Sequence, residues 1–297
     1  MPKLHFLIAD RIKEQEGLSA LTNPPLLSKL PRSYKRVGHV ALVNLDTTLL
    51  PWKHEVGEAL LAVVSRSIRT VARFIQPIHG QIRTPSVEWL AGDPSFATVH
   101  KEHGTLYALD AQKLMFSAGN HFERHRVSEF VSQLPMSIPV VLDMFACVGN
   151  LSLAMAVQNP RTQVIALELN PEAINLLRKS VELNGIGISR FRVVGGDNRL
   201  TCPSNVADLV ILGYFGVDEQ QLRLAVHALR SEVGGWLMLH DISGLDEKSP
   251  AMQCLENTVL AANPDWMLVQ VKRRKIKSIG ASFVHWVFDC EVRPQSR

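Results

Sequence analysis

The stretch IPVVLDMFACVGN, residues 138–150, decides the fold of this chain of 297 residues. Its first part, IPVVLDMF (138–145), is an apolar run too short for a helix, and it ends in an acidic residue and a turn containing Gly149. A strand buried on both faces of a parallel sheet has this pattern. We therefore predict a strand at 138–145, followed by a helix from about 151 to 157.

The same alternation continues downstream. It predicts helices at 171–184 and 219–232, and strands at 163–167, 190–194, 207–212 and 235–241. The last two apolar runs, WMLVQVKRRKIKS and SFVHWVFDCEV, are joined by Ile279-Gly280-Ala281 and predict an antiparallel hairpin. A mostly parallel α/β sheet closed by such a hairpin resembles the Rossmann-like class I methyltransferase architecture, which we assign to residues 133–297.

The N-terminal half predicts a smaller unit. Residues 1–33 are expected to form a loosely structured lead, because Pro24, Pro25 and Pro31 interrupt it. Residues 34–132 are expected to form a small α/β domain with a connecting helix. Its predicted elements are a strand at 37–45, a helix at 55–75, short strands at 96–99 and 105–109, and a helix at 116–131.

Composition narrows the class of protein. The apolar fraction of 46% and the charged fraction of 20% are typical of soluble globular proteins, and the net charge of +4 is weak evidence for a polyanionic partner. No apolar run approaches the ~20 residues of a membrane span. The four cysteines are far apart, which favours free thiols in the cytoplasm over a zinc site or disulfides.

Polar residues follow three successive predicted strands. Asp143, Phe145 and Gly149 lie where the first strand meets its helix, and small residues there let the backbone approach a ligand. Glu168 ends the second strand, where its two oxygens can accept both hydroxyls of a ribose; the alternative is a helix cap, for which Asn170 is better placed. Asp197 and the Asn198 backbone follow the third strand and suit an adenine, although Gly-Asp-Asn is also turn chemistry.

These three features together predict an adenosyl cofactor. NAD is the competing ligand, but its diphosphate needs a glycine-rich turn at a helix N-terminus. The loop at 143–150 offers one glycine and no such cradle. S-adenosylmethionine is therefore favoured.

Several motifs resemble one pair of sister families. VVLDMFACVGNLSLAMAV, ALELNPEAINLLRKSVELNG and GGDNR are similar to the tRNA guanosine N1-methyltransferases that act beside the anticodon, and more similar to the wybutosine-synthesis 3-amino-3-carboxypropyl transferases. The resemblance runs from about Val37 to Val292 through VGHVALVNL, LLPWKHEVGEALL, IRTPSVEWLAGD, VHKEHGTLYALD and RKIKSIGASFVHWVFDCEV.

Few residues distinguish the two sister families. The methyltransferases usually carry an Asn-Pro-type motif after the fourth strand, where this chain has Leu212-Gly213-Tyr214. The segment FSAGNHFER (116–124) and Asn150-Leu151-Ser152-Leu153 also resemble the aminocarboxypropyl transferases. That resemblance implies transfer of the 3-amino-3-carboxypropyl group to a tricyclic guanosine derivative of phenylalanine tRNA. The alternatives are a guanosine N1-methyltransferase and a catalytically silent tRNA-binding module.

The resemblance also implies roles for residues. By the families' pattern, Ser117 and Arg124 contact the cofactor, and Glu168, Asp197 and Asn198 hold its adenosine. We also expect a monomer without a metal. No residue stands out as a general base that would accept a proton. The candidates for positioning the target nucleobase are Asn120, Glu123, Gly213 and Tyr214. Cys147 departs from the families, which have glycine there, and its Cβ is expected to crowd the cofactor loop.

One basic stretch is a candidate tRNA contact. Each phosphate that a protein neutralises steepens the salt dependence of binding. The alternative is a set of solubilising cations on an edge strand. The residues expected to contact phosphates are Arg83, Lys272, Arg273, Arg274, Lys275 and Lys277.

Overall fold

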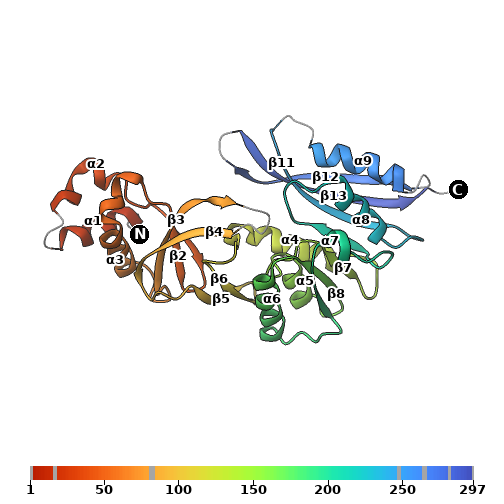
Figure 1. Cartoon of the computed structure of the whole chain (residues 1–297), viewed down its shortest axis with the longest axis horizontal. Coiled ribbons are helices and arrows are strands. Elements are labelled where there is room, and N and C mark those ends of the chain that lie inside the picture. The colour runs from red at the N-terminus through yellow and green to blue at the C-terminus, as the bar shows by residue number, and fades with distance from the viewer. Residues whose placement is uncertain are drawn as a thin grey trace. The chain divides into compact units, whose positions relative to one another are not determined.

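The computed structural model describes residues 3–15, 19–79, 84–245, 249–262, 266–279 and 282–295. The chain divides into two compact units: Met1–Glu102 with Leu106–Gly119, and His103–Thr105 with Asn120–Arg297. Figure 1 labels their helices and most of their strands. Among the described residues, no helix combines the length and the apolar character needed to cross a membrane. Each unit has a sheet of its own.

The first unit is built on a four-stranded sheet with the order β1-β2-β3-β4. β2 and β3 run parallel, and the other neighbours are antiparallel. β5 and β6 form a separate two-stranded ribbon. The strands are β1 (Lys35–Val37), β2 (Val40–Val43), β3 (Thr70–His79), β4 (Thr84–Gly92), β5 (Ala97–Glu102) and β6 (Thr105–Asp110).

Described residues between 3 and 33 contribute to the core of the first unit, and the expected loose lead is wrong for them. Ile8 and Ile12 are one helical turn apart on α1 (Leu4–Lys13), and both are fully buried. They pack with Leu21, Leu30 and Leu60 in one apolar cluster. The other helical elements are α2 (Pro24–Leu27), α3 (Lys53–Val63) and the 3-10 turns Ser19–Thr22 and Thr47–Trp52.

Two further predictions for the first unit are corrected. The strand expected at 37–45 is divided by a turn at Gly38, whose φ is +57°. The helix expected at 55–75 ends at Val63, because Val64 is already extended, and β3 begins at Thr70. Both errors come from apolar residues that continue across a change of structure.

The second unit contains a seven-stranded sheet with the order β12-β13-β11-β10-β7-β8-β9. β11, β10, β7, β8 and β9 are parallel, and β13 is antiparallel to both β11 and β12. This confirms the Rossmann-like fold with a closing hairpin. The strands are β7 (Val140–Asp143), β8 (Gln163–Glu168), β9 (Phe191–Gly195), β10 (Leu209–Leu212), β11 (Gly235–Ser243), β12 (Trp266–Ile279) and β13 (Phe283–Pro294).

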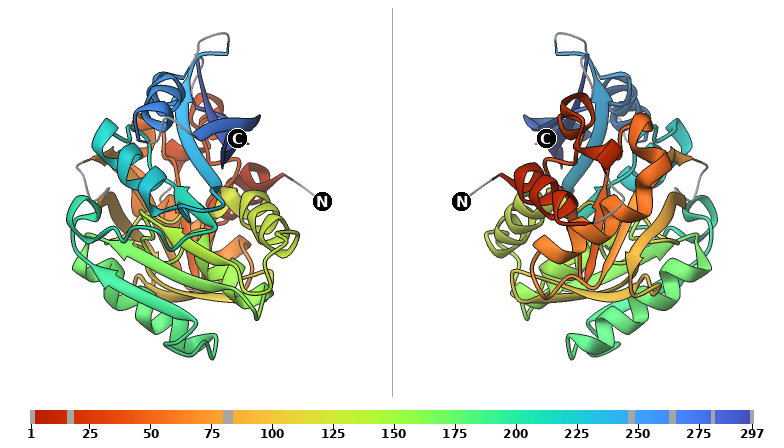
Figure 2. Two further views of the ribbon diagram at one scale, coloured as in Figure 1. Left: turned by 90° about the vertical axis from the view of Figure 1, so that its right-hand side faces the viewer. Right: turned by 90° about the vertical axis from the view of Figure 1, so that its left-hand side faces the viewer.

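Helices cover both faces of this sheet. In Figure 2, α4 lies on one side of β11, and α8 and α9 lie on the other. α9 was not predicted, although Met252, Leu255 and Val259 follow helical spacing and are buried. α8 ends at Ala228, earlier than expected, because Leu229 is extended. The helices are α4 (His121–Ser132), α5 (Ser152–Gln158), α6 (Pro171–Leu183), α7 (Asn198–Thr201), α8 (Glu219–Ala228) and α9 (Pro250–Ala262).

Candidate functional site

The strand order of the second unit locates a candidate site. The chain runs from β7 outward through β8 to β9, and then places β10 on the opposite side of β7. Ligands of open α/β sheets bind beyond the carboxyl ends of the strands, where the order reverses in this way. The loops after β7 and β10 flank that point. The residues predicted for the cofactor from the strand ends, Asp143, Glu168 and Asp197, lie on this edge of the sheet.

Asp143 ends β7 and is buried, with 2% of its surface exposed. The Phe145 N–H donates to its Oδ1 over 3.2 Å. Burial raises the pKa of the Asp143 carboxyl to about 6; the hydrogen bonds from Ser152 and Phe145 oppose the shift, and the nearby Glu168 adds to it. Asp143 is therefore a shielded anion near neutral pH that holds the turn after β7 in place.

Cys147 occupies a backbone conformation that favours glycine. Its φ is +51°, within the left-handed region. Its N–H nevertheless donates to Glu168 Oε2 over 2.6 Å, so the loop accommodates the side chain. Burial, and then the charge of Glu168, raise the pKa of the Cys147 thiol to about 12. The thiol stays protonated near neutral pH, which argues against a nucleophilic role.

Gly149 is required by the loop itself. Its φ is +83°, and an added Cβ would lie 2.7 Å from the Cβ of Leu153. This glycine lets the loop turn directly into α5. Its predicted contact with a cofactor stays a prediction.

Glu168 joins the ends of β7 and β8. Its Oε1 accepts the Asn170 N–H over 2.8 Å, and its Oε2 accepts the N–H of Cys147. Burial raises the pKa of this carboxyl. Asn170 is the cap of α6, as expected, since its side chain accepts the Glu172 N–H. A carboxylate offers about four acceptor positions, so Glu168 keeps capacity for the hydroxyls of a ligand.

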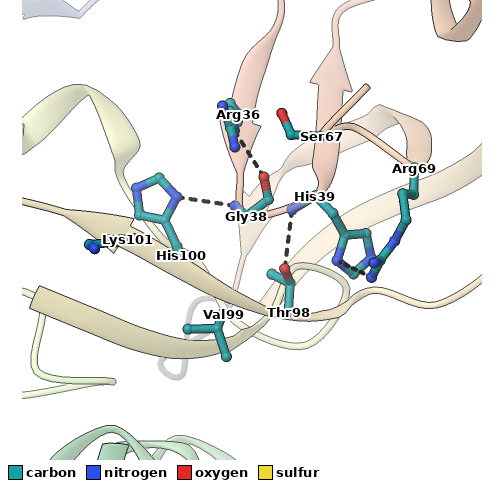
Figure 3. Close-up of a pocket in the computed structure, with 9 residues that line it drawn as sticks. All are labelled: Arg36, Gly38, His39, Ser67, Arg69, Thr98, Val99, His100 and Lys101. Atoms are coloured by element: carbon teal, nitrogen blue, oxygen red, sulfur yellow. Dashed lines mark hydrogen bonds between the residues drawn. The ribbon is translucent and has the colours of Figure 1, made fainter. Parts of the chain in front are cut away.

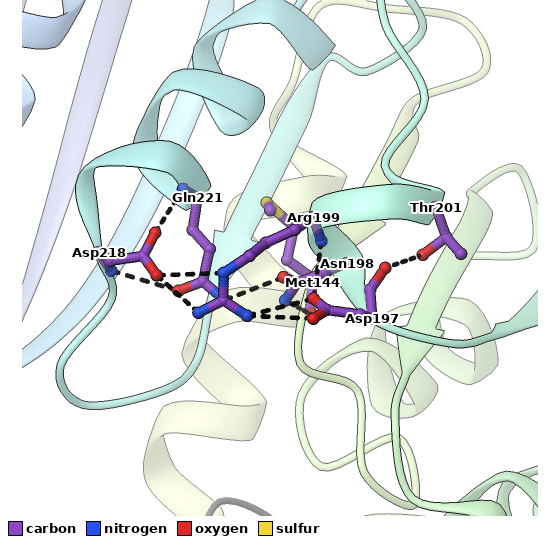
Figure 4. A network of polar contacts seen from close by, with 7 residues as sticks. All are labelled: Met144, Asp197, Asn198, Arg199, Thr201, Asp218 and Gln221. Atoms are coloured by element: carbon purple, nitrogen blue, oxygen red, sulfur yellow. Dashed lines mark hydrogen bonds and ion pairs between the residues drawn. The ribbon is translucent and has the colours of Figure 1, made fainter.

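Asp197 and Asn198 lie in the polar network of Figure 4. Asp197 caps α7 by accepting the Arg199 N–H over 2.9 Å, and its carboxylate also pairs with the Arg199 guanidinium at 3.2 Å. The Asn198 amide donates to the Met144 carbonyl over 2.8 Å and accepts from Gln221 over 2.9 Å. The Asn198 side chain thus ties the ends of β7 and β9 to α8, and the contact of its backbone with an adenine stays a prediction.

Phe145 and Tyr214 meet at the reversal of strand order. Their rings are nearly parallel, at 13°, with centroids 5.0 Å apart. Phe145 follows β7 and Tyr214 follows β10, so the stack spans the two loops that flank the candidate site. Gly213 lies beside it, and a Cβ there would meet its nearest neighbour, Leu151, at an ordinary 3.5 Å. A Cβ at 213 would therefore fit without a clash, so the packing of the second unit does not itself require glycine there.

The two candidate residues on α4, Glu123 and Arg124, are both buried but have different surroundings. Glu123 is 3% exposed and pairs with Arg126 at 2.6 Å, and Arg126 also pairs with Asp289 of β13 at 2.8 Å. This buried network occupies Glu123 and connects α4 to the hairpin. Arg124 is 2% exposed. Ser117, its expected companion at the cofactor, belongs to the first unit.

The basic stretch of β12 is largely engaged within the second unit. Arg273 lies over the Trp286 ring at 3.6 Å, Arg274 pairs with Asp289 at 3.0 Å, and Lys277 donates to Asn120 Oδ1 over 2.9 Å. For Lys272 and Lys275 no ion pair is recorded within the described ranges. Arg83 lies outside the described residues.

One buried pair escaped the sequence analysis. His240 of β11 and His285 of β13 join through Nδ1 and Nε2 at 3.0 Å, and both are at most 3% exposed. Burial, and then the charge of Arg126, lower the pKa of His240 to about 3. The Phe215 ring packs edge-on against His285, with centroids 4.8 Å apart, so the pair lies next to the loop after β10. The signal was a histidine within each of two apolar strands.

The sheet order and the polar strand ends define a Rossmann-like domain of the class I methyltransferase type. The TRM5/TYW2 methyltransferase domain family matches residues 98–249, and the TYW2 N-terminal domain family matches residues 15–95. The chain belongs to the TRM5/TYW2 family, which confirms the resemblance seen in the sequence.

Individual relatives agree with this assignment. The chain is 32% identical over 288 residues to tRNA wybutosine-synthesizing protein 2/3/4 of Arabidopsis thaliana, covering 95% of this chain but 28% of that protein. It is 36% identical over 200 residues to tRNA(Phe) (4-demethylwyosine(37)-C(7)) aminocarboxypropyltransferase of Pyrococcus horikoshii, covering 67% and 68% of the two chains. A crystal structure of P. horikoshii TYW2 in complex with MeSAdo matches with a TM-score of 0.77 and 28% identity, over 96% and 99% of the chains. The chain thus spans about a quarter of the plant protein and two thirds or more of the archaeal one.

Proposed function

We propose that this protein transfers the 3-amino-3-carboxypropyl group of S-adenosylmethionine to a tricyclic modified guanosine beside the anticodon of tRNA(Phe), as a step of wybutosine biosynthesis. The observation that carries the proposal is the set of polar strand ends around the reversal point, in a chain whose relatives include an aminocarboxypropyltransferase. We expect the enzyme to act as a cytoplasmic monomer.

The site residues fit the cofactor. Glu168 would accept the ribose hydroxyls, and Asp197 with the Asn198 backbone would hold the adenine. Arg124, a buried guanidinium, and Ser117 would contact the carboxylate of the methionine part. The hydrogen bond from the Cys147 N–H to Glu168 forms with the cysteine in place, which supports this fit. The bound cofactor supplies a sulfonium that activates the carbons attached to it.

Positioning decides which carbon reacts. Attack on the methionine γ-carbon leaves methylthioadenosine, whereas attack on the methyl group leaves S-adenosylhomocysteine. Gly213, which has no side chain, and the stacked rings of Phe145 and Tyr214 lie at the reversal of strand order, where a base could enter. We propose that Gly213, Tyr214 and Asn120 position the tricyclic base, and that Glu123 acts indirectly by fixing α4 through Arg126.

Product analysis tests this function. The purified full chain is incubated with S-adenosylmethionine and tRNA carrying the tricyclic precursor, and separately with unmodified tRNA, and the small-molecule product is identified by mass spectrometry. Methylthioadenosine formed only with the precursor tRNA is the expected result. S-adenosylhomocysteine would establish methyl transfer instead. Absence of both products, with no cofactor binding, would identify a silent module.

A paired substitution tests the cofactor site. Glu168→Gln is expected to weaken S-adenosylmethionine binding by about 30-fold, because hydrogen bonds to a charged acceptor are lost. Glu172→Gln, an exposed position in the first turn of α6, is the control and is expected to bind normally. Isothermal titration calorimetry measures both variants. Equal affinities would remove Glu168 from the site.

A further inference from the structure

The first unit contains a polar pocket that the cofactor site does not use. Its volume is about 440 Å³, and Figure 3 shows its lining. Three short segments contribute: the turn between β1 and β2, the residues just before β3, and the strand β5. The pocket is lined by residues that include Arg36, Gly38, His39, Arg69, Thr98, His100 and Lys101.

The turn at the base of the pocket is fixed by its own hydrogen bonds. The Gly38 N–H donates to His100 Nδ1 over 3.1 Å, and the His39 N–H donates to Thr98 Oγ1 over 3.1 Å. Gly38 has a φ of +57°, and an added Cβ would lie 2.0 Å from Thr98 Oγ1. Only glycine fits this close approach of the turn to β5. The pocket is therefore a built feature of the fold.

Neutral acceptors hold the two arginines of the pocket. Arg36 donates through Nε to the Gly38 carbonyl over 3.0 Å. Arg69 donates through Nη2 to His39 Nδ1 over 3.2 Å, while His39 Nε2 lies 3.2 Å from the Ser95 carbonyl. The Ser95 carbonyl has no proton to donate, so His39 Nε2 must carry the proton of this hydrogen bond. Its Nδ1 is then free to accept from Arg69, which makes His39 an uncharged acceptor. Both guanidiniums are thus oriented by hydrogen bonds to uncharged acceptors, which leave their positive charge unneutralised.

The positive charge of the pocket is not neutralised by the described part of the chain. No ion pair is recorded there for Arg36, Arg69 or Lys101, whereas Arg73 of β3 pairs with Glu88 at 2.6 Å. Among the described residues, two acids lie beside the lining. Glu102 Oε2 is 3.5 Å from His100 Nε2, and Asp93 donates its backbone N–H to the Arg69 carbonyl while its carboxylate accepts the Ser95 N–H. Two guanidiniums and an ammonium around one hollow favour an oxyanion, and a guanidinium presents paired donors that match a phosphate.

We propose that this pocket binds a phosphodiester of the tRNA substrate. The inference rests on the proposed function, which supplies the tRNA. Arg36 and Arg69 provide the paired donors, Lys101 adds a point charge, and the exposed rim admits a continuous chain rather than an enclosed small molecule. Contacts of this kind fix the register of a nucleic acid without reading its sequence.

The test is the salt dependence of tRNA binding by the full chain. Binding of fluorescently labelled tRNA(Phe) is measured by anisotropy at several salt concentrations. Arg36→Gln with Arg69→Gln is expected to raise the Kd about tenfold and to reduce the slope of log Kd against log salt by about one to two. Arg36→Lys with Arg69→Lys keeps the charge, and is expected to retain most of the slope while losing several-fold in affinity.

A control removes the same charge elsewhere in the first unit. Arg11→Gln with Lys13→Gln changes two cations of α1 that do not line the pocket and is expected to bind like the wild type. Equal weakening by the glutamine variants of the pocket and of α1 would show long-range charge only and overturn the proposal. Unchanged affinity in the pocket variant would overturn it as well.

The two proposals fail in different ways. Binding is measured without turnover, so a wild type that binds tRNA but forms no methylthioadenosine would refute the proposed reaction and leave the pocket supported. A wild type that forms the product, with a pocket variant that binds tRNA equally well, would refute the pocket alone. Unchanged S-adenosylmethionine affinity in the pocket variant shows that the second unit is intact. Inorganic phosphate that competes with tRNA equally for the wild type and the pocket variant would also exclude a phosphate site there.

Discussion

Two groups of charged residues, one in each unit, are held in opposite ways. In the second unit, Glu123 and Asp289 are at most 3% exposed, and Arg126 links them across α4 and β13. In the first unit, Arg36 and Arg69 are exposed and are held by a carbonyl and a neutral imidazole. Charges of the first kind serve the fold, and charges of the second kind remain available to a ligand.

This difference changes how basic sequence is interpreted. The densest basic stretch, residues 272–277, lies in the second unit, yet Arg273, Arg274 and Lys277 all have partners there. The cations of the pocket are far apart in the sequence. The fold brings them to one hollow, where the turn at Gly38 packs against β5. Charge density along the chain is therefore a poor guide to which cations can bind phosphate.

The largest expected effect comes from breaking the buried network. Arg126→Met leaves the carboxylates of Glu123 and Asp289 buried with less compensation, and is expected to lower the free energy of unfolding by about 3 kcal/mol. Denaturant unfolding of the full chain, followed by circular dichroism, measures the loss. Arg69→Gln in the pocket is the matched control and should stay within about 0.5 kcal/mol of the wild type. If both variants lost the same free energy of unfolding, the buried ion pairs of the second unit would contribute no more to stability than the exposed arginines of the pocket.

The sequence predicted the second unit better than the first because its signals are local. The parallel strands β7, β8 and β10 are short apolar runs bounded by polar turns, and each was placed within a few residues. α9 had the same kind of signal in its helical spacing. In the first unit, the apolar pattern of α3 continues into β3, so periodicity alone could not find the boundary near Val64.

The site could be predicted only where it follows strand ends. Glu168 and Asp197 follow β8 and β9, and the structure places them on the expected edge of the sheet. The stack of Phe145 on Tyr214 depends on which strands are neighbours. The bond from Cys147 to Glu168 depends on the conformation of one loop. These contacts arise from tertiary packing, which spacing along the chain does not encode.

A buried neutral group gives the next largest expected effect. The pKa of His240 is about 3, below its ordinary value of 6.5. Between these values the unfolded chain binds a proton that the folded chain does not, so stability falls as the pH falls through this window. At about 1.4 kcal/mol per pH unit, the wild type loses about 2 kcal/mol through His240 between pH 6.5 and pH 5. His240→Gln is expected to lack that loss.

The comparison of variants isolates this histidine. Asp143 contributes with the opposite sign, because its raised pKa of about 6 adds stability as the pH falls toward 3.8, but it is present in both proteins. Denaturant unfolding at pH 7.5 and pH 5 gives the difference. His125→Gln, on the exposed face of α4, is the control and should follow the wild type. If His240→Gln lost as much stability between pH 7.5 and pH 5 as the wild type, the pH dependence would come from a group other than His240.

The smallest expected effect concerns the backbone at Cys147. A β-branched residue at positive φ is strained by about 1–3 kcal/mol. Cys147→Val, at a φ of +51°, is therefore expected to be about 1.5 kcal/mol less stable than the wild type, whereas Cys147→Gly should stay within about 1 kcal/mol. Cys202→Val is the control, since Cys202 has a φ of −63°. Equal costs at both sites in denaturant unfolding would mean that packing, and not the left-handed backbone, limits residue 147. A larger cost at 147, with normal cofactor affinity in Cys147→Gly, would show that the loop needs its conformation and not its sulfur.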